Sequence, residues 1–473
     1  MRFFDFFRWF LLTIVFVSAS LPAEGALRDD ATAAMRKAAS YYRDKVAVHG
    51  GYVYHYTLDF DKRWGEGLAT AEQVWVQPPG TPTVGLAFLK AYAATGDKFY
   101  LDAAKAAGDA LVYGQLKSGG WTNAVDFDPR GSQVALYRNG KGRGRNNSTL
   151  DDGITQGAIR LLVRLDEALE FKDAKIHVAA KIALDALLAA QFPNGAFPQV
   201  WTGPVESQPI VKPSYPKYEW RTEGKIKNYW DMYTLNDNVA GNVTAALLEA
   251  WQVYKDERYK QALVKLGDFL VLAQMPAPQP AWCQQYSYEM IPIWARRFEP
   301  PAVSGSESQD VMESLMKIHV LTNDRKYLEP IPRAIEYLRK SQLADGRLAR
   351  YYELHTNRPL YMTRRGDNYS LTNDDRDLPD HYGWKGVSRL DAIEARYKSY
   401  AANHLPADET IVTVDKHVQG TIAALDAEGR WVSTFQGEGL IGQPKFRAGD
   451  RYLSSAVFSE NLIELANYIR LSK

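Results

Sequence analysis

Two short acidic motifs carry residue types that could hold a metal ion. Residues 149–153 read TLDDG and residues 234–238 read TLNDN. Each motif lies directly before an apolar helical stretch, where a single Asp or Asn commonly caps the helix N-terminus. Because each motif carries at least two such side chains in succession, capping alone does not account for them. We expect Asp151, Asp152 and Asp237 to be able to share a hard cation through oxygen ligands.

A second group of candidate residues lies in a long loop that combines aromatic, amide and guanidinium side chains. Residues 282–286 read WCQQY and residues 294–301 read WARRFEPP. Aromatic rings stack on sugar faces, and a guanidinium pairs two hydrogen bonds with a carboxylate. Trp282, Gln284 and Arg296 are therefore candidates for binding an acidic sugar, although a packed structural loop explains the same composition.

A third charged group lies at residues 358–367 (RPLYMTRRGD) and 374–384 (DDRDLPDHYGW). It contains Arg364 and Arg376, and surface solvation is the simpler explanation for its charges. None of the eight histidines has a spacing typical of metal ligands. No nucleophile elbow, P-loop or dinucleotide-binding motif stands out.

Composition excludes several classes of protein. The 473 residues include 57 Lys and Arg against 56 Asp and Glu, for a net charge of +1. This balance argues against a nucleic-acid partner that needs a broad basic face. The single cysteine, Cys283, excludes an intramolecular disulfide and a cysteine-rich metal site.

The N-terminus has the pattern of a signal peptide. Arg2 and Arg8 precede the apolar run at residues 9–17, and small residues follow. We predict a signal peptide at residues 1–26 and one domain at residues 27–473, secreted or periplasmic; an uncleaved membrane anchor is the alternative. No other segment approaches the roughly 20 apolar residues of a membrane span, so no membrane partner is expected after signal removal.

Internal repetition is the clearest indication of the fold. Four stretches begin with Asp, continue with helical apolar spacing and end with Gln at the same separation, namely residues 97–115, 173–191, 256–274 and 324–342. Another apolar helical stretch precedes each of them, and a loop with Gly or Pro and aromatic residues follows. This unit of two helices and a long loop is typical of both open solenoids and closed helical toroids.

The two ends of the chain favour a toroid. Residues 30–47 resemble the second helix of a unit, and residues 455–473 resemble the first. We therefore predict an all-α fold, an α/α toroid in which the termini complete one split helix pair and the long loops lie on one face. The alternation TIVTVD within residues 409–447 predicts minor β-structure near the C-terminus.

With these motifs in place, the sequence resembles the pectic acid lyases, the family-ten polysaccharide lyases of the helical-toroid type. Similar stretches are the run from Trp75 to Asp97, TLDDGIT from Thr149, FPNGAFPQ from Phe192, TLNDNVA from Thr234, AWCQQYS from Ala281, WARRFEPPAVSGSES from Trp294 and TNRPLY from Thr356. The resemblance implies cleavage of polygalacturonate by β-elimination. It also implies calcium as a bridge between protein carboxylates and the substrate uronate.

The resemblance assigns roles to individual residues. Asp151 is similar to a catalytic-cleft aspartate and, with Asp237, to the calcium ligands. Arg296 and Arg364 are similar to the arginines that grip the substrate. The base is expected to be an arginine, and Arg376 is the one available in DDRDLPDHYGW, where the family reads E-R-R before G-Y-x-W.

Two departures from the family pattern qualify this reading. Asn238 stands where the family usually has a second Asp, which predicts weak cation affinity without substrate. The altered segment around Arg376 leaves room for a non-catalytic protein that binds acidic polysaccharide. A toroid glycoside hydrolase, with Asp151 as acid and Asp237 as base, is the other alternative. The many arginines favour an anionic sugar and elimination.

Overall fold

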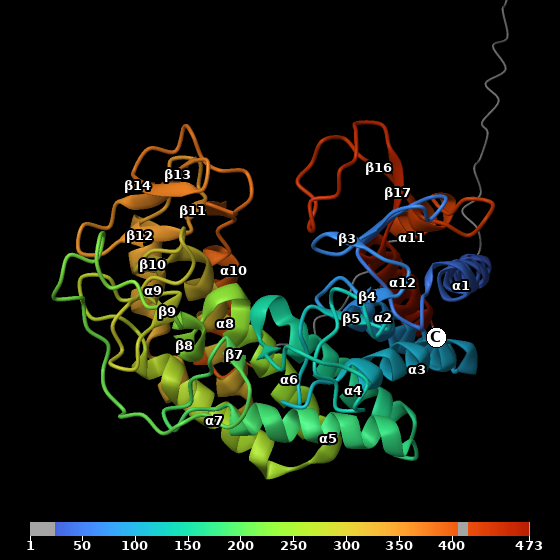
Figure 1. Cartoon of the computed structure of the whole chain (residues 1–473), viewed down its shortest axis with the longest axis horizontal. Coiled ribbons are helices and arrows are strands. Elements are labelled where there is room, and N and C mark those ends of the chain that lie inside the picture. The colour runs from blue at the N-terminus through green and yellow to red at the C-terminus, as the bar shows by residue number, and fades with distance from the viewer. Residues whose placement is uncertain (1–23, 405–414, 473) are drawn as a thin grey trace, which may run out of the picture.

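The computed structural model describes residues 24–404 and 415–472 (Figure 1). The apolar run of the predicted signal peptide, and all but the last residue of TIVTVD, lie outside these residues. Within the described ranges, no helix is both long and apolar enough to cross a membrane.

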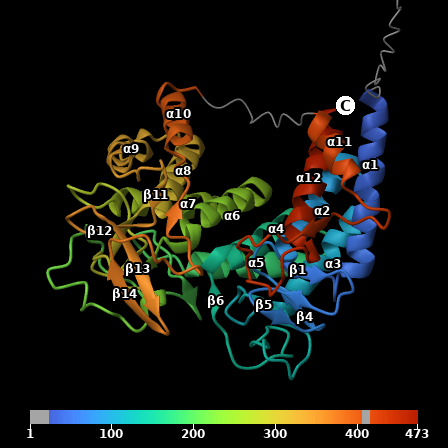
Figure 2. The same ribbon diagram turned by 90° about the horizontal axis from the view of Figure 1, so that it is seen from above.

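The first helices of the repeated units follow one another in an arc. In the order α12, α2, α4, α6, α8 and α10, each contacts the next. Figure 2 shows this arc from above, with an opening between α10 and α12. The helices are α2 (Thr81–Thr95), α4 (Ile154–Ala168), α6 (Val239–Tyr254), α8 (Gly305–Thr322), α10 (Leu390–Ala401) and α12 (Ser455–Leu471). The predicted α/α toroid is confirmed.

The second helices pack against the first ones. They are α3 (Lys98–Gly114), α5 (Ala174–Ala189), α7 (Glu257–Leu272) and α9 (Ile331–Lys340). The spacing predicts one continuous helix for the fourth stretch, residues 324–342, but the structure has two helical segments there. Its first turn, η5 (Arg325–Tyr327), is separate from α9, because Pro330 and Pro332 cannot donate backbone hydrogen bonds there.

The chain termini form the split pair that the sequence predicts. Helix α1 (Glu24–Tyr41) is the second helix of this pair, and α12 is the first. Helix α1 continues into a short π-helical turn, η1 (Tyr42–Val46), and packs against α12 (Figures 1 and 2). The rings of Tyr42 and Phe458 stack with centroids 3.7 Å apart. A further helix, α11 (Asp415–Ala423), contacts both α1 and α12.

The Asp and Gln of the repeat have structural roles. Asp97 caps α3 by accepting from the Phe99 backbone N–H, and Asp173 caps α5 in the same way. Gln115 Nε2 donates to the Gly119 carbonyl in its own loop (2.8 Å) and to the Ala179 carbonyl in α5 (2.9 Å). Gln191 and Gln274 each donate the same pair of hydrogen bonds, one and two units further along the chain. The repeated Gln therefore ties each loop to the next unit.

Gln115→Leu is expected to lower the free energy of unfolding by about 1–3 kcal/mol, because it removes two buried hydrogen bonds. Gln115 has no exposed surface. Gln342→Leu is the matched control, since Gln342 occupies the same repeat position but is exposed and should cost less. Denaturant unfolding of both variants measures the difference; equal losses would contradict this role.

Short antiparallel strands join the loops. The five-stranded sheet has the order β16 (Val432–Thr434), β17 (Arg451–Ser454), β1 (His55–Thr57), β2 (Arg63–Trp64), β3 (Leu68–Ala69). The four-stranded sheet has the order β10 (Ala302–Ser304), β12 (Tyr351–Glu353), β13 (Pro359–Arg365), β14 (Asn368–Thr372). The strand pairs are β4 (Gln73–Trp75) with β5 (Ala124–Asp126), β6 (Ser148–Thr149) with β7 (Val200–Trp201), β8 (Tyr233–Thr234) with β9 (Gln285–Tyr286), and β11 (Leu348–Ala349) with β15 (Lys385–Gly386). Strands β16 and β17 confirm β-structure near the C-terminus, but the sheet containing β13 and β14 was not predicted.

The loops collect beside the N-terminal ends of the first helices, as predicted. Thr149 N–H donates to the Trp121 carbonyl, and Thr234 N–H donates to the Phe197 carbonyl. Each loop thus lies against the segment that starts the next first helix. This arrangement brings the acidic motifs and the long loops to the same face of the toroid.

Candidate active site

The two acidic motifs have the same backbone. Each forms a 3-10 turn directly before a first helix, η2 (Asp151–Gly153) before α4 and η4 (Asn236–Asn238) before α6. The central residue of each turn has left-handed backbone, with φ of 45° at Asp152 and 53° at Asp237. Such backbone is uncommon for residues other than glycine and costs about 1 kcal/mol or more. By position, Asp152 corresponds to Asp237, and Asp151 corresponds to Asn236.

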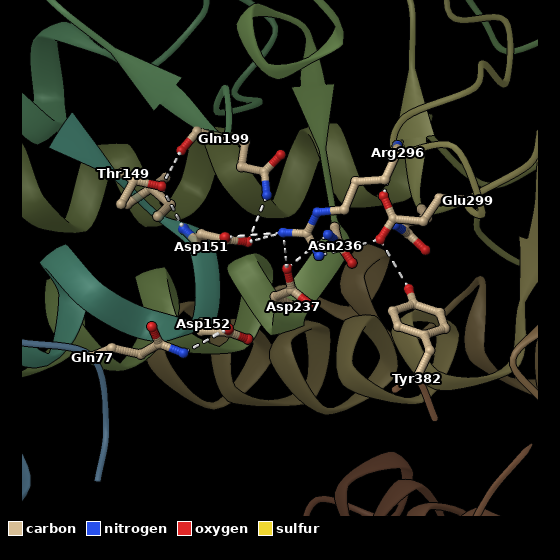
Figure 3. Close-up of polar contacts among 12 residues, drawn as sticks. Gln77, Thr149, Asp151, Asp152, Gln199, Asn236, Asp237, Arg296, Glu299 and Tyr382 are labelled. Carbon is tan, nitrogen blue, oxygen red and sulfur yellow. Dashed lines mark hydrogen bonds and ion pairs between the residues drawn. The ribbon is translucent and has the colours of Figure 1, made fainter. Parts of the chain in front are cut away.

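A guanidinium from the long loop joins the two motifs. Arg296 Nη2 donates to Asp151 Oδ1 (2.9 Å) and Oδ2 (3.0 Å) and lies 3.7 Å from Asp237 Oδ2. Gln199 Nε2 donates to Asp151 Oδ1 at 2.6 Å, and Asn236 Nδ2 donates to Asp237 Oδ2 at 2.7 Å. Figure 3 shows the Arg296 side chain reaching between the two carboxylates. The structure therefore brings together three of the predicted site residues.

Asp152 faces a different partner. Gln77 Nε2 donates to Asp152 Oδ2 and to Glu66 Oε1, both at 2.9 Å. Gln77 and Glu66 come from the segment around β2, β3 and β4. The acidic cluster therefore extends into the N-terminal part of the chain, which motif spacing does not reveal.

The acidic side chains of this cluster lie close enough together to change one another's pKa. The scarcity of water around Asp152, followed by the charges of Asp151 and Glu66, raises the pKa of Asp152 to about 6. Burial and the neighbouring Asp151 raise the pKa of Asp237 well above its usual range. Burial raises the pKa of Asp151, but the neighbouring Asp237 and the Arg296 guanidinium, which binds both Asp151 oxygens, together hold it below its ordinary value. An arrangement of this kind stabilises an added positive charge.

Arg350 is a site residue that the sequence analysis missed. Its Nη2 donates to Asn236 Oδ1 (3.1 Å) and Glu307 Oε1 (2.8 Å), and lies 3.7 Å from Asp237 Oδ1. Its guanidinium lies over the Tyr382 ring, 4.6 Å from the centroid. One signal was present, because Arg350 lies in the loop after the fourth Gln of the repeat. Loops in that position supply Gln199 to the same site.

Arg376 and Arg364 lie outside the cluster. The Arg376 side chain is 87% exposed and, among the described residues, hydrogen-bonds only to Asp374. That carboxylate raises the pKa of Arg376, so it holds the guanidinium protonated. Arg364 Nε donates to the Gly366 carbonyl, and its guanidinium lies over the Tyr369 ring. Neither arginine contacts the acidic motifs in the part of the chain that the structure describes.

The expectation that Trp282 and Gln284 contact substrate is wrong. Trp282 has no exposed surface, and its Nε1 donates to the Leu270 carbonyl of α7 at 2.7 Å. It therefore packs in the core and cannot stack on a sugar. Gln284 is 3% exposed and accepts a hydrogen bond from the Tyr351 hydroxyl. Both residues support the loop from inside.

Comparison with protein families decides the class. Residues 115–347 match the sequence model of the pectic acid lyase family. The chain carries a pectic acid lyase domain. A domain of this family implies a polysaccharide lyase, and it contains both acidic motifs and Arg296. Gln77, Arg350 and Tyr382 contribute to the site of the lyase from outside the matched range.

The comparison with curated proteins gave no match. Among solved structures, the lyase is similar to a family 10 polysaccharide lyase from Cellvibrio cellulosa (20% identity, 68% of this chain, 97% of that chain, TM-score 0.46). It is also similar to a D-mannose isomerase (14%, 96% and 100%, TM-score 0.48) and to the cellobiose 2-epimerase of Spirochaeta thermophila (15%, 96% and 99%, TM-score 0.48).

Proposed function

We propose that the protein is a calcium-dependent pectate lyase that cleaves polygalacturonate by β-elimination. The observation that carries this proposal is the position of Arg296 between Asp151 and Asp237 within a pectic acid lyase domain. β-Elimination beside a uronate needs a positive charge next to the substrate carboxylate, a base for the C5 proton and departure of the O4 linkage. This site offers groups for the first two needs.

The charge of the site explains why a cation is needed. A uronate brings another negative charge to a cluster in which carboxylates outnumber guanidiniums. The carboxylates are those of Glu66, Asp151, Asp152, Asp237, Glu299 and Glu307, and the guanidiniums are those of Arg296 and Arg350. Without added positive charge, repulsion would oppose binding of the substrate carboxylate.

The residues present fit a calcium ion that the protein and the substrate bind together. Asp151 and Asp237 supply hard oxygen atoms, the kind that calcium prefers. Among the described residues, no three acidic, histidine or cysteine side chains are grouped to enclose an ion, so the protein offers an incomplete set that substrate oxygens would complete. Bound calcium would neutralise the uronate and lower the energy of the enolate-like transition state.

Arg296 replaces Arg376 as the candidate base. It is the arginine in direct contact with both acidic motifs, whereas Arg376 is exposed. Burial lowers the pKa of Arg296, but Glu299, Asp151 and Asp237 raise it more. Arg296 therefore acts as a base only at alkaline pH and after the aspartates are neutralised. The neutral guanidine of Arg296 takes the C5 proton, the electron pair of the C5–H bond forms the C4–C5 double bond, and O4 leaves with the other half of the chain and takes a proton from water.

The formation of unsaturated product tests the proposal directly. Polygalacturonate should give a rise in ultraviolet absorbance with calcium present and none with chelator. New reducing ends without that absorbance would indicate a hydrolase. Polymer binding without any cleavage, at every calcium concentration and at alkaline pH, would refute the lyase proposal in favour of a binding protein.

Calcium should stabilise the fold more at neutral than at acid pH. The raised pKa of Asp152, about 6, means that the folded state binds a proton more tightly than the unfolded chain. Its contribution to stability is thus present below about pH 4 and lost as pH rises through about 6, where the ionised cluster can bind calcium instead. The calcium-induced shift in melting temperature should be larger at about pH 7.5 than at about pH 5. Equal shifts would contradict the assignment, and Asp231→Asn should leave the difference unchanged.

The place of action follows from the substrate. Polygalacturonate is too large to enter a cell unaided, so we propose that the predicted signal peptide exports the enzyme to the periplasm or the medium. Fractionation of the producing cells tests this; full-length protein retained in the cytoplasm would contradict it.

A further inference from the structure

Arg296 is held from two sides by different kinds of partner. On one side, Asp151 and Asp237 face the space between the motifs, and their side chains are 28% and 12% exposed. On the other side, Glu299 accepts from the Arg296 backbone N–H (2.9 Å) and from its Nη1 (3.5 Å). The Glu299 side chain is 1% exposed. The proposed calcium ligands and Glu299 thus lie at opposite ends of one guanidinium (Figure 3).

The partners differ in what happens when a cation binds. A cation on Asp151 and Asp237 competes with Arg296 for the same oxygen atoms, so those two contacts weaken. Glu299 is buried behind Arg296, and its hydrogen-bond donors already occupy it. Its carboxylate therefore remains the partner that fixes the guanidinium once the aspartates are engaged.

Glu299 is in turn fixed by a tyrosine from a distant segment. The Tyr382 hydroxyl donates to Glu299 Oε1 at 3.0 Å and lies 2.8 Å from the Tyr351 hydroxyl. The Tyr382 ring also supports the guanidinium of Arg350. Glu299 and Tyr382 therefore link the two arginines of the site into one network.

We propose that Glu299, held by Tyr382, is the positioning residue that keeps Arg296 aligned with the C5 proton when calcium binds. This inference rests on the proposed lyase function. A buried carboxylate must be well satisfied by donors, and here the donors are the arginine to be positioned and the tyrosine that orients the carboxylate. The segment around Tyr382, where the sequence departs from the family pattern, thus contributes to the site through Tyr382 and not through Arg376.

Glu299→Gln tests this role with little change in volume. We expect kcat to fall about tenfold to a hundredfold, because a displacement of about 1 Å in a reacting group can cost that much, while KM changes less than about threefold. Tyr382→Phe keeps the ring over Arg350 and should lower kcat by about threefold to tenfold. Tyr452→Phe is the matched control, since Tyr452 donates to Glu438 away from the site; it should behave as wild type.

Several outcomes would overturn the inference. An active wild type with unchanged kcat in Glu299→Gln would refute it while leaving the lyase proposal intact. If Glu299→Gln does not fold, unchanged kcat in Tyr382→Phe would have the same meaning. A crystal structure of the wild type with calcium tests the geometry even if no product forms: the Arg296 guanidinium must remain paired with Glu299. A guanidinium that has left Glu299 would refute the positioning role.

Discussion

Asp237→Asn is expected to abolish calcium-dependent cleavage of polygalacturonate, with kcat/KM lowered by about a hundredfold or more. Asparagine keeps the size of the side chain but removes the charge that would hold the cation. Asp237 is 12% exposed and lies 3.7 Å from both Arg296 and Arg350, so its carboxyl group is central to the cluster. Initial rates of unsaturated product, measured across a calcium titration, give the effect.

The control for this variant is Asp231→Asn, six residues earlier in the chain. Asp231 lies in the turn η3 (Tyr229–Asp231), and it is the Asp231 backbone carbonyl that accepts from the Tyr288 hydroxyl. This control should keep wild-type rates. Unchanged activity of Asp237→Asn at low calcium would mean that the carboxylates serve only the local backbone.

Arg296→Lys is expected to lower kcat by about a hundredfold or more with a smaller change in KM, as for a group that acts in the transition state. Lysine keeps the charge but lacks the planar fork that contacts Asp151 and Glu299 at opposite ends. Arg376→Lys should leave polygalacturonate cleavage intact, because its 87% exposed side chain pairs only with Asp374 among the described residues. Steady-state kinetics of both variants at alkaline pH measure the difference.

The reverse result would also be informative. If Arg376→Lys lost activity and Arg296→Lys did not, the exposed loop would have to close over the site during catalysis, and the base would be Arg376. If neither variant lost activity, Arg364 would be the next arginine to test. A folded Arg296→Lys variant that binds polygalacturonate as tightly as wild type would separate catalysis from binding.

The helical repeat and the acidic motifs were predictable because their causes are local. An Asp at the start of α3, α5 and α7 accepts from backbone N–H groups within a few residues, and the apolar spacing selects the buried helix face. The TLDDG and TLNDN motifs carry a backbone turn that depends on their own residues. Their repetition at the same place in adjacent units was enough to predict that Asp151 and Asp237 lie together.

The roles within the long loops were harder to predict, because residue type does not determine which way a side chain points. Trp282 and Arg296 belong to the same loop region, but Trp282 packs against α7 while Arg296 reaches the acidic motifs. Arg376 has the residue type expected for the base, yet the nearby Asp374 holds it in solvent. Composition is the same for a buried and an exposed position, so it misassigned Trp282; the family resemblance suggested Arg376, whose side chain lies in solvent.

The sequence alone determined the toroid of helix pairs, the pectic acid lyase resemblance and the pair of acidic motifs. Only the tertiary structure decided which other residues complete the site, namely Gln77, Gln199, Glu299, Arg350 and Tyr382. Helix formation and capping depend on neighbours within a few positions, which the sequence displays directly. The site instead depends on contacts between loops of different units, and their geometry exists only after the repeats have packed together.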